Sequence, residues 1–277
     1  MGASGGHFQR GFTLVEAILV IAITGAIAGV VAVFIQGPVQ GYFDTVRRTE
    51  LADAADTALR QIGRDLRSAL PNSIRVTSSG AVQFLEFIPT VNGGRYWANA
   101  AGEACFITGC SSISSVGSVI ATDGEHAGDY LTIFNYYNNA GNDCGTDLPS
   151  AYCGQNIAAI TGSTDGGGQD VFSFAAAKRF YPAGGSPGKR FQIVQAPVSY
   201  VCNPVTGLLS LRTGYGFQAV QPTVAGGDVL AANVSGCSFQ YSAGPWQRLG
   251  LATLSLTLSK QGESIVLYHE VHVDNAP

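Results

Sequence analysis

The stretch Arg10-Gly11-Phe12-Thr13-Leu14-Val15-Glu16 decides how the rest of this chain is arranged. It is followed by an uncharged run at 17–35, which is long enough to span a bilayer as a helix of about 20 residues. Glu16 is the unusual member, because a carboxylate in an apolar helix costs on the order of 2.5–3.5 kcal/mol at the bilayer centre. A cost of that size indicates that Glu16 is kept for a function.

The order of glycine, phenylalanine, glutamate and apolar run resembles the cleavage and methylation signal of type IV prepilins and of type II secretion pseudopilins. The resemblance implies that prepilin peptidase, a membrane enzyme, removes a leader at 1–11 by cutting between Gly11 and Phe12. It also implies that the new N-terminal Phe12 is methylated and that Glu16 serves methylation and assembly. The partners implied are the peptidase, other major and minor pilins, and the inner-membrane pilus assembly platform.

The chemistry of the cut chain supports this interpretation. Cleavage gives Phe12 a free α-amino group, whose pKa of about 7.7–8.0 makes it largely cationic at neutral pH. We predict a helix that starts at Phe12, so that Glu16 lies one turn from the amine on the same face and near the positive end of the helix dipole. In a filament, the amine of one subunit can instead pair with Glu16 of its neighbour. Either pairing gives the carboxylate a cationic partner that the uncut chain lacks.

Two other interpretations of this segment stay open. An ordinary secretory signal peptide would use Ala26-Ile27-Ala28 as an A-x-A cleavage site, although the apolar run continues to Ile35 and Glu16 would interrupt it. A plain signal anchor would leave Glu16 without a role. The N-terminus of the mature protein separates the interpretations, because the pilin interpretation predicts Phe12 and the signal-peptide interpretation predicts a residue near Val30.

A second helical pattern follows the apolar run. We predict one stem helix at 12–70, transmembrane at 12–36 and amphipathic at 42–70. Gly37-Pro38 lies between the two parts and predicts a kink, because proline removes a helix hydrogen bond. An equally open alternative is that the helix melts or bends there on leaving the bilayer. The apolar residues of the second part recur at helical spacing: Leu51, Ala55, Leu59, Ile62, Leu66 and Leu70.

The stem is also similar in detail to minor pilins of the MshO type, which belong to mannose-sensitive haemagglutinin (MSHA) pili. That similarity implies a minor pilin that takes part in starting or capping a pilus. The segment 59–67 resembles instead the J-type minor pseudopilin of type II secretion, which is the alternative machine. The pieces that carry the MshO-type similarity lie at 37–42, 47–48, 52–60 and 69–76, with weaker ones at 128–131 and 151–152.

Beyond Asn72 the pattern changes to period two with frequent turn residues, which is typical of strands. The predicted fold class is therefore α+β and pilin-like, with a long N-terminal helix and a predominantly antiparallel β head at 72–277. Stretches rich in glycine, serine and asparagine at 92–102, 138–150 and 162–168 are expected to be surface loops. The predicted strands lie at 81–88, 130–136, 170–175, 190–201, 208–213, 237–242, 251–258 and 265–273, the last two as a hairpin.

The charge of the leader predicts that the head lies outside the cytoplasm. Arg10 in the leader favours a cytoplasmic N-terminus, so the chain is expected to cross the inner membrane once, in contact with lipid. The head is then periplasmic at first, and at the pilus or cell surface later. The net charge of −4, with charged residues at 12%, offers no basic field for nucleic acid.

All the cysteines fall in this outer part, where an even number predicts disulfides. Sequence does not choose among the possible connectivities, and pairing between neighbours is the simplest proposal. A zinc site would need close cysteine pairs, and only Cys105 and Cys110 approach that spacing. The neighbour pairs are Cys105 with Cys110, Cys144 with Cys153, and Cys202 with Cys237.

The sequence contains no constellation of nucleophile and base or of paired carboxylates, so we expect neither an enzyme nor a cofactor. His269-Glu270-Val271-His272 is one residue short of H-E-x-x-H, and on a strand its histidines point to opposite faces. The loops at 142–147 and 165–170 contain oxygen ligands that could bind calcium, although neither loop matches an EF-hand pattern. Loop aromatics motivate one more alternative, an adhesin-like module at a pilus tip: Tyr96, Trp97, Tyr136, Tyr137 and Trp246.

Overall fold

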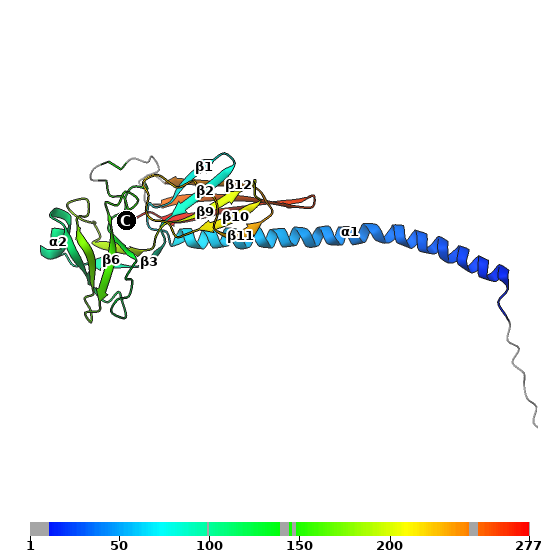
Figure 1. Cartoon of the computed structure of the whole chain (residues 1–277), viewed down its shortest axis with the longest axis horizontal. Coiled ribbons are helices and arrows are strands. Elements are labelled where there is room, and N and C mark those ends of the chain that lie inside the picture. Colours follow the sequence, from blue (N-terminus) through cyan, green and yellow to red (C-terminus); the bar gives the residue numbers. More distant parts are fainter. Residues whose placement is uncertain (1–10, 99, 139–143, 146–147, 244–248, 277) are drawn as a thin grey trace, which may run out of the picture. The chain divides into compact units, whose positions relative to one another are not determined.

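The computed structural model describes residues 11–276 apart from 99, 139–143, 146–147 and 244–248 (Figure 1). Residues 1–10 of the leader, Trp246 among the loop aromatics, and most of the possible calcium loop at 142–147 therefore lie outside the described residues. The chain divides into two compact units, Met1–Glu50 and Leu51–Pro277.

Helix α1 spans Leu14–Arg67 and continues without a break through Gly37 and Pro38. The proline therefore does not end the helix, and no melted segment separates its apolar part from its amphipathic part. The first turn is capped by Thr13, whose Oγ1 accepts the N–H of Glu16 at 3.3 Å. The helix begins after this cap, two residues later than the expected start at Phe12.

The helix also ends three residues before the expected Leu70. The backbone leaves the helix because it bonds to a segment of the head: the N–H of Leu70 donates to the carbonyl of Ile88 at 2.8 Å, and the N–H of Thr90 donates to the carbonyl of Ser68 at 3.0 Å. Leu70 is nevertheless buried, as its place in the apolar pattern predicts. Tertiary hydrogen bonds thus decide where this helix stops.

Between α1 and the C-terminus, the described residues form a predominantly antiparallel β structure, which confirms the α+β fold class. One short helix, α2 (Ala100–Ile107), interrupts the strands. The strands are β1 (Arg75–Ser79), β2 (Val82–Phe87), β3 (Thr90–Tyr96), β4 (Cys110–Val116), β5 (Tyr130–Thr132), β6 (Ile157–Thr164), β7 (Val171–Lys178), β8 (Arg190–Val194), β9 (Val198–Asn203), β10 (Leu208–Arg212), β11 (Asp228–Ala232), β12 (Val234–Ala243), β13 (Leu249–Lys260) and β14 (Glu263–Asp274).

The strands make two sheets and a closed barrel. One sheet has the order β1-β2-β9-β10-β11, the other β12-β13-β14, and the barrel β3-β4-β7-β6-β5-β8. Figure 1 shows the five strands of the first sheet side by side along the C-terminal part of α1, with β3, β6 and α2 farther along the head. The head therefore has a first part that packs on the helix and a second part, the barrel, that has a core of its own.

The core of the first part contains the apolar stripe of α1. Leu51, Leu59, Ile62 and Leu66 are at most 3% exposed and pack against both sheets. Their spacing repeats the helical period that the sequence shows. The barrel has a separate core that includes Phe172, and it depends little on α1.

Several strand predictions need correction. The expected single strand at 190–201 is two strands, β8 and β9, because Pro197 lies between them and cannot donate a ladder hydrogen bond. The expected strand at 130–136 ends at Thr132. Two expected loops are partly regular, since 92–102 contains the end of β3 and the start of α2, and 162–168 begins inside β6.

The structure joins the cysteines as three neighbour pairs, Cys105–Cys110, Cys144–Cys153 and Cys202–Cys237. The third pair connects β9 of the five-stranded sheet to β12 of the three-stranded sheet. A covalent bond thus holds the two sheets together over the core that contains α1.

Candidate functional site

The segment 11–16 forms the entrance to α1. Thr13 and Glu16 stand at the spacing of a capping box, in which a threonine at the cap and a glutamate three residues later satisfy the free N–H groups of the first turn. The carbonyl of Thr13 also accepts the N–H of Ala17 at 3.1 Å. Thr13 is a residue that the sequence analysis did not single out, although the T-x-x-E spacing could have indicated it.

In the uncut chain Phe12 lies outside the helix, so the placement of its freed amine and Glu16 on one helical face stays a prediction for the cut chain. Its side chain is 78% exposed, and Glu16 is exposed as well. The carboxylate of Glu16 has no hydrogen bond or ion pair to the side chain of another described residue. A partner for this carboxylate therefore has to come from the freed amine after a local rearrangement, or from a second molecule.

The helix that follows exposes its apolar residues all round. Every residue between 11 and 43 is exposed, and this stretch includes large side chains such as Leu14, Ile21 and Phe34. Among the described residues, α1 is the one helix long and apolar enough to cross a membrane. A continuous apolar surface of this size needs lipid or other helices around it. The segment is thus an anchor or a packing element.

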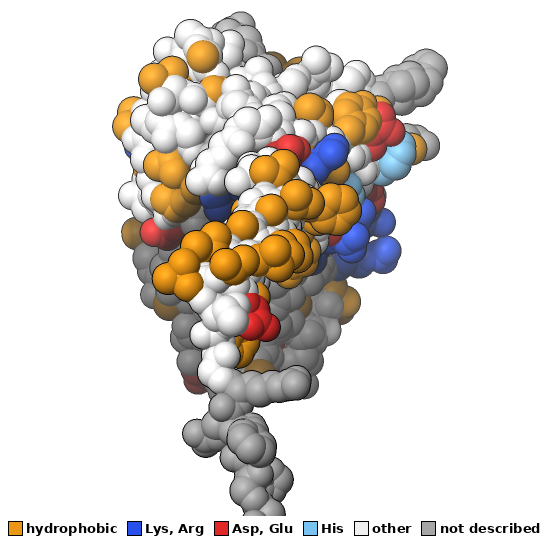
Figure 2. All heavy atoms as spheres, turned by 90° about the vertical axis from the view of Figure 1, so that its right-hand side faces the viewer, with side chains coloured by type: hydrophobic (Ala, Val, Ile, Leu, Met, Phe, Trp, Pro, Cys, Tyr) orange, Lys and Arg blue, Asp and Glu red, His pale blue; other side chains and the backbone are white. Residues whose placement is uncertain are grey.

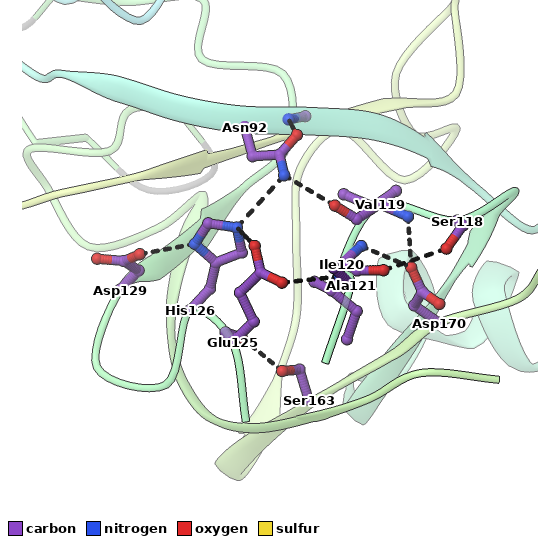
Figure 3. Close-up of polar contacts among 11 residues, drawn as sticks. Asn92, Ser118, Val119, Ile120, Ala121, Glu125, His126, Asp129, Ser163 and Asp170 are labelled. Atoms are coloured by element: carbon purple, nitrogen blue, oxygen red, sulfur yellow. Dashed lines mark hydrogen bonds and ion pairs between the residues drawn. The ribbon is translucent and has the colours of Figure 1, made fainter. Parts of the chain in front are cut away.

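On the barrel, a polar network closes the loop between β4 and β5 (Figure 3). Asn92 of β3 donates through Nδ2 to the carbonyl of Val119 at 2.9 Å, and the same nitrogen lies 3.3 Å from Nε2 of His126. Nδ1 of His126 lies 2.9 Å from the Asp129 carboxylate, while Glu125 accepts the N–H of Ala121 at 2.7 Å. The network fastens this loop to the barrel wall.

Asp170 anchors the other end of the same loop. It is fully buried, and one carboxylate oxygen accepts the N–H groups of Val119 and Ile120, the latter at 3.0 Å. Burial alone would raise the pKa of the Asp170 carboxyl. The N–H groups of Val119 and Ile120, followed by hydrogen bonds from the Gly166 backbone and the Asp165 side chain, outweigh this effect and hold the pKa below its ordinary value of 3.8.

This shift predicts an acid-sensitive head. Because the pKa of Asp170 is lower in the folded chain than in the unfolded chain, its stabilisation is present above pH 3.8 and is lost as the pH falls through the folded value. We expect Asp170→Asn to lower the unfolding free energy at pH 7 by about 1.5–3 kcal/mol, since it removes hydrogen bonds to a charged acceptor. Chemical denaturation of the full chain in detergent between pH 3 and 7 measures this.

The control is Asp228→Asn, the same change at an exposed position at the start of β11. The variant Asp170→Asn should lose stability less steeply in acid than the wild-type protein, while Asp228→Asn should follow the wild-type profile. Parallel profiles for wild type and Asp170→Asn would contradict the assignment.

The other residues that the sequence suggested do not come together as a site. Among the described residues, no group of three or more histidine, cysteine or acidic side chains lies close enough to hold a metal. His269 is half-buried and His272 is exposed, at positions of β14 that alternate between the two faces. Tyr96 is buried against Phe106 and its hydroxyl accepts the N–H of Ser186, so it cannot belong to an exposed aromatic surface.

Comparison with known proteins gives one match, at the N-terminus. Residues 7–32 match the family model described as the prokaryotic N-terminal methylation motif. No curated protein and no solved structure matches the chain. The motif supports a type IV pilin or pseudopilin that is processed by prepilin peptidase and assembles with other pilins. The motif and the single apolar helix are consistent with a single-pass anchor in the inner membrane.

Proposed function

We propose that this protein is a minor pilin of a type IV pilus of the MSHA class, which takes part in initiating or capping pilus assembly. Prepilin peptidase cuts between Gly11 and Phe12, and Phe12 is then methylated. The observation that supports this most strongly is the combination of a methylation motif with an apolar helix that is exposed on all sides. Such a helix suits a molecule that first lies in a bilayer and later among other stems.

In this proposal the chain has two successive environments. The N-terminus is cytoplasmic and the head periplasmic while 12–36 spans the inner membrane. The assembly platform then moves the chain into the pilus, where lipid contacts are replaced by helix contacts and Glu16 pairs with the α-amino group of a Phe12. The disulfides suit this location, because the periplasm and the cell surface are oxidising.

The alternative within the same class is a J-type minor pseudopilin of a type II secretion system, which the segment 59–67 favours. Deleting the chain separates the two machines. Loss of surface pili with unchanged protein secretion, together with detection of the chain in sheared pili, is the result we expect. Normal pili with blocked secretion would contradict the pilus assignment and favour the pseudopilin.

A further inference from the structure

A groove with a basic lining lies where α1 meets β14. It encloses about 360 Å³ and is lined by Asp56, Arg60, Arg64 and Arg67 of the helix and His269 of the strand. The three arginines are four and three residues apart, so they share one face of α1. Figure 2 shows basic side chains gathered beside a histidine on one side of the molecule.

The groove carries more positive charge than the chain neutralises. Asp56 pairs with Arg60 at 2.6 Å, and both side chains are at least half exposed. The guanidinium groups of Arg64 and Arg67 make no hydrogen bond or ion pair with any residue that the structure describes. The nearest further carboxylate in the helix sequence, Asp65, accepts the hydroxyl of Tyr200 instead. Two guanidinium groups thus lack a counter-charge.

The wall of the groove is built into the packing of the head. A Cβ at position 63 would lie 3.0 Å from Nε2 of His269, so the absence of a side chain at Gly63 lets this ring sit against the helix. Glycine in a helix interior costs about 0.5–1 kcal/mol relative to alanine. Gly63 nevertheless occupies a buried position of α1, beside the arginines.

We infer that this groove receives a segment with two carboxylates from a neighbouring filament subunit. The inference rests on the proposed function, because stems become surrounded by other subunits in a filament. An arginine that loses water without gaining a partner destabilises an assembly by several kcal/mol. Arg64 and Arg67 therefore need acceptors from outside the chain, and a carboxylate matches the planar fork of a guanidinium with two parallel hydrogen bonds.

The direct test joins the two partners covalently. The full-chain variant Arg64→Lys/Arg67→Lys keeps both charges and supplies amines that a carbodiimide couples only to carboxylates in contact. Sheared filaments that contain this variant are treated and digested, and the linked peptides are sequenced by mass spectrometry. We expect links from position 64 or 67 to an aspartate or glutamate of another filament subunit. Filaments that contain the variant but yield no such link, or links within one chain only, overturn the inference.

A charge-reversal pair adds a functional measurement. The variant Arg64→Glu/Arg67→Glu should be cut and anchored as the wild-type chain is, yet enter filaments about tenfold less. The matched control is Arg95→Glu/Arg190→Glu, which makes the same charge change at two exposed, directly paired positions of β3 and β8. Equal incorporation of both variants overturns the groove contact and leaves the proposed function intact. Absence of the wild-type chain from all filaments overturns both.

Discussion

The variant Glu16→Ala is expected to be cut between Gly11 and Phe12 as the wild-type chain is, but to enter filaments about tenfold less or worse. The cut chain carries an ammonium group at Phe12, and the exposed carboxylate of Glu16 has no side-chain partner of its own among the described residues. Removing one partner of an ion pair in an apolar surrounding leaves the other charge uncompensated and costs about 3–5 kcal/mol, well over the 1.4 kcal/mol that corresponds to a factor of ten. Quantitative immunoblotting of membranes and sheared filaments measures the ratio.

The cap at Thr13 provides a control that separates the effect of the Glu16 charge from the effect of helix capping. Glu16→Gln keeps a side chain that can complete the capping box but removes the charge, whereas Thr13→Ala removes the cap and keeps the carboxylate. We expect Glu16→Gln to be as defective as Glu16→Ala, and Thr13→Ala to assemble nearly as the wild type does. Normal assembly of Glu16→Gln would show that Glu16 acts through the cap, and the charge-pair mechanism would be wrong.

The second large effect is expected at a buried ion pair in the head. Arg75 of β1 donates to Glu86 of β2, and both side chains are at most 1% exposed. The guanidinium also donates to the carbonyls of Gln218 and Ala219 and lies 3.6 Å from the centre of the Tyr152 ring. One arginine thus holds a strand pair and a long connection together.

Removing one partner of this pair should strongly destabilise the head. Glu86→Ala leaves a buried guanidinium without its carboxylate, and we expect the unfolding free energy to fall by about 3–5 kcal/mol. Burial raises the pKa of Glu86 despite the opposing effect of Arg75, which shows that the charged carboxylate is costly to keep inside. The double change Arg75→Met/Glu86→Leu should therefore recover at least half of the loss.

Denaturant titration of the full chain in detergent measures both effects. The exposed pair serves as the comparison, because Arg60→Ala removes the partner of Asp56 in solvent and should cost less than about 1 kcal/mol. A Glu86→Ala variant as stable as Arg60→Ala would show that the Arg75–Glu86 pair does not hold the head together.

The helical part of this fold was predictable because its signals are local. The uncharged run and the spacing of Leu51, Leu59 and Ile62 both lie within one element. The same holds for the hairpin of β13 and β14, whose alternation is long and regular. The end of α1 at Arg67 is not a local signal, because it depends on backbone hydrogen bonds between 68–70 and 88–90.

The barrel was not predictable in the same way. Its strands β3 and β4 are rich in glycine and serine, so they lack the apolar alternation that marks a strand. Gly94 illustrates this, because a Cβ there would lie 2.9 Å from Val119 and 3.1 Å from Phe191. The packing of the barrel therefore requires glycine at this position, although glycine in a sequence usually indicates a loop. The basic groove was not predictable from the sequence for a related reason. Its lining joins α1 to a strand about 200 residues away in sequence, at a contact set by long-range packing.

The pairing of Glu16 depends on one covalent event, the cut that creates the amine of Phe12. Sequencing the N-terminus of the protein isolated from membranes, with an intact-mass measurement of the same sample, tests for this cut most directly. We expect a chain that begins at Phe12, with one added methyl group on the α-amine. A chain that begins near Val30, or one that retains residues 1–11 in assembled filaments, would contradict it.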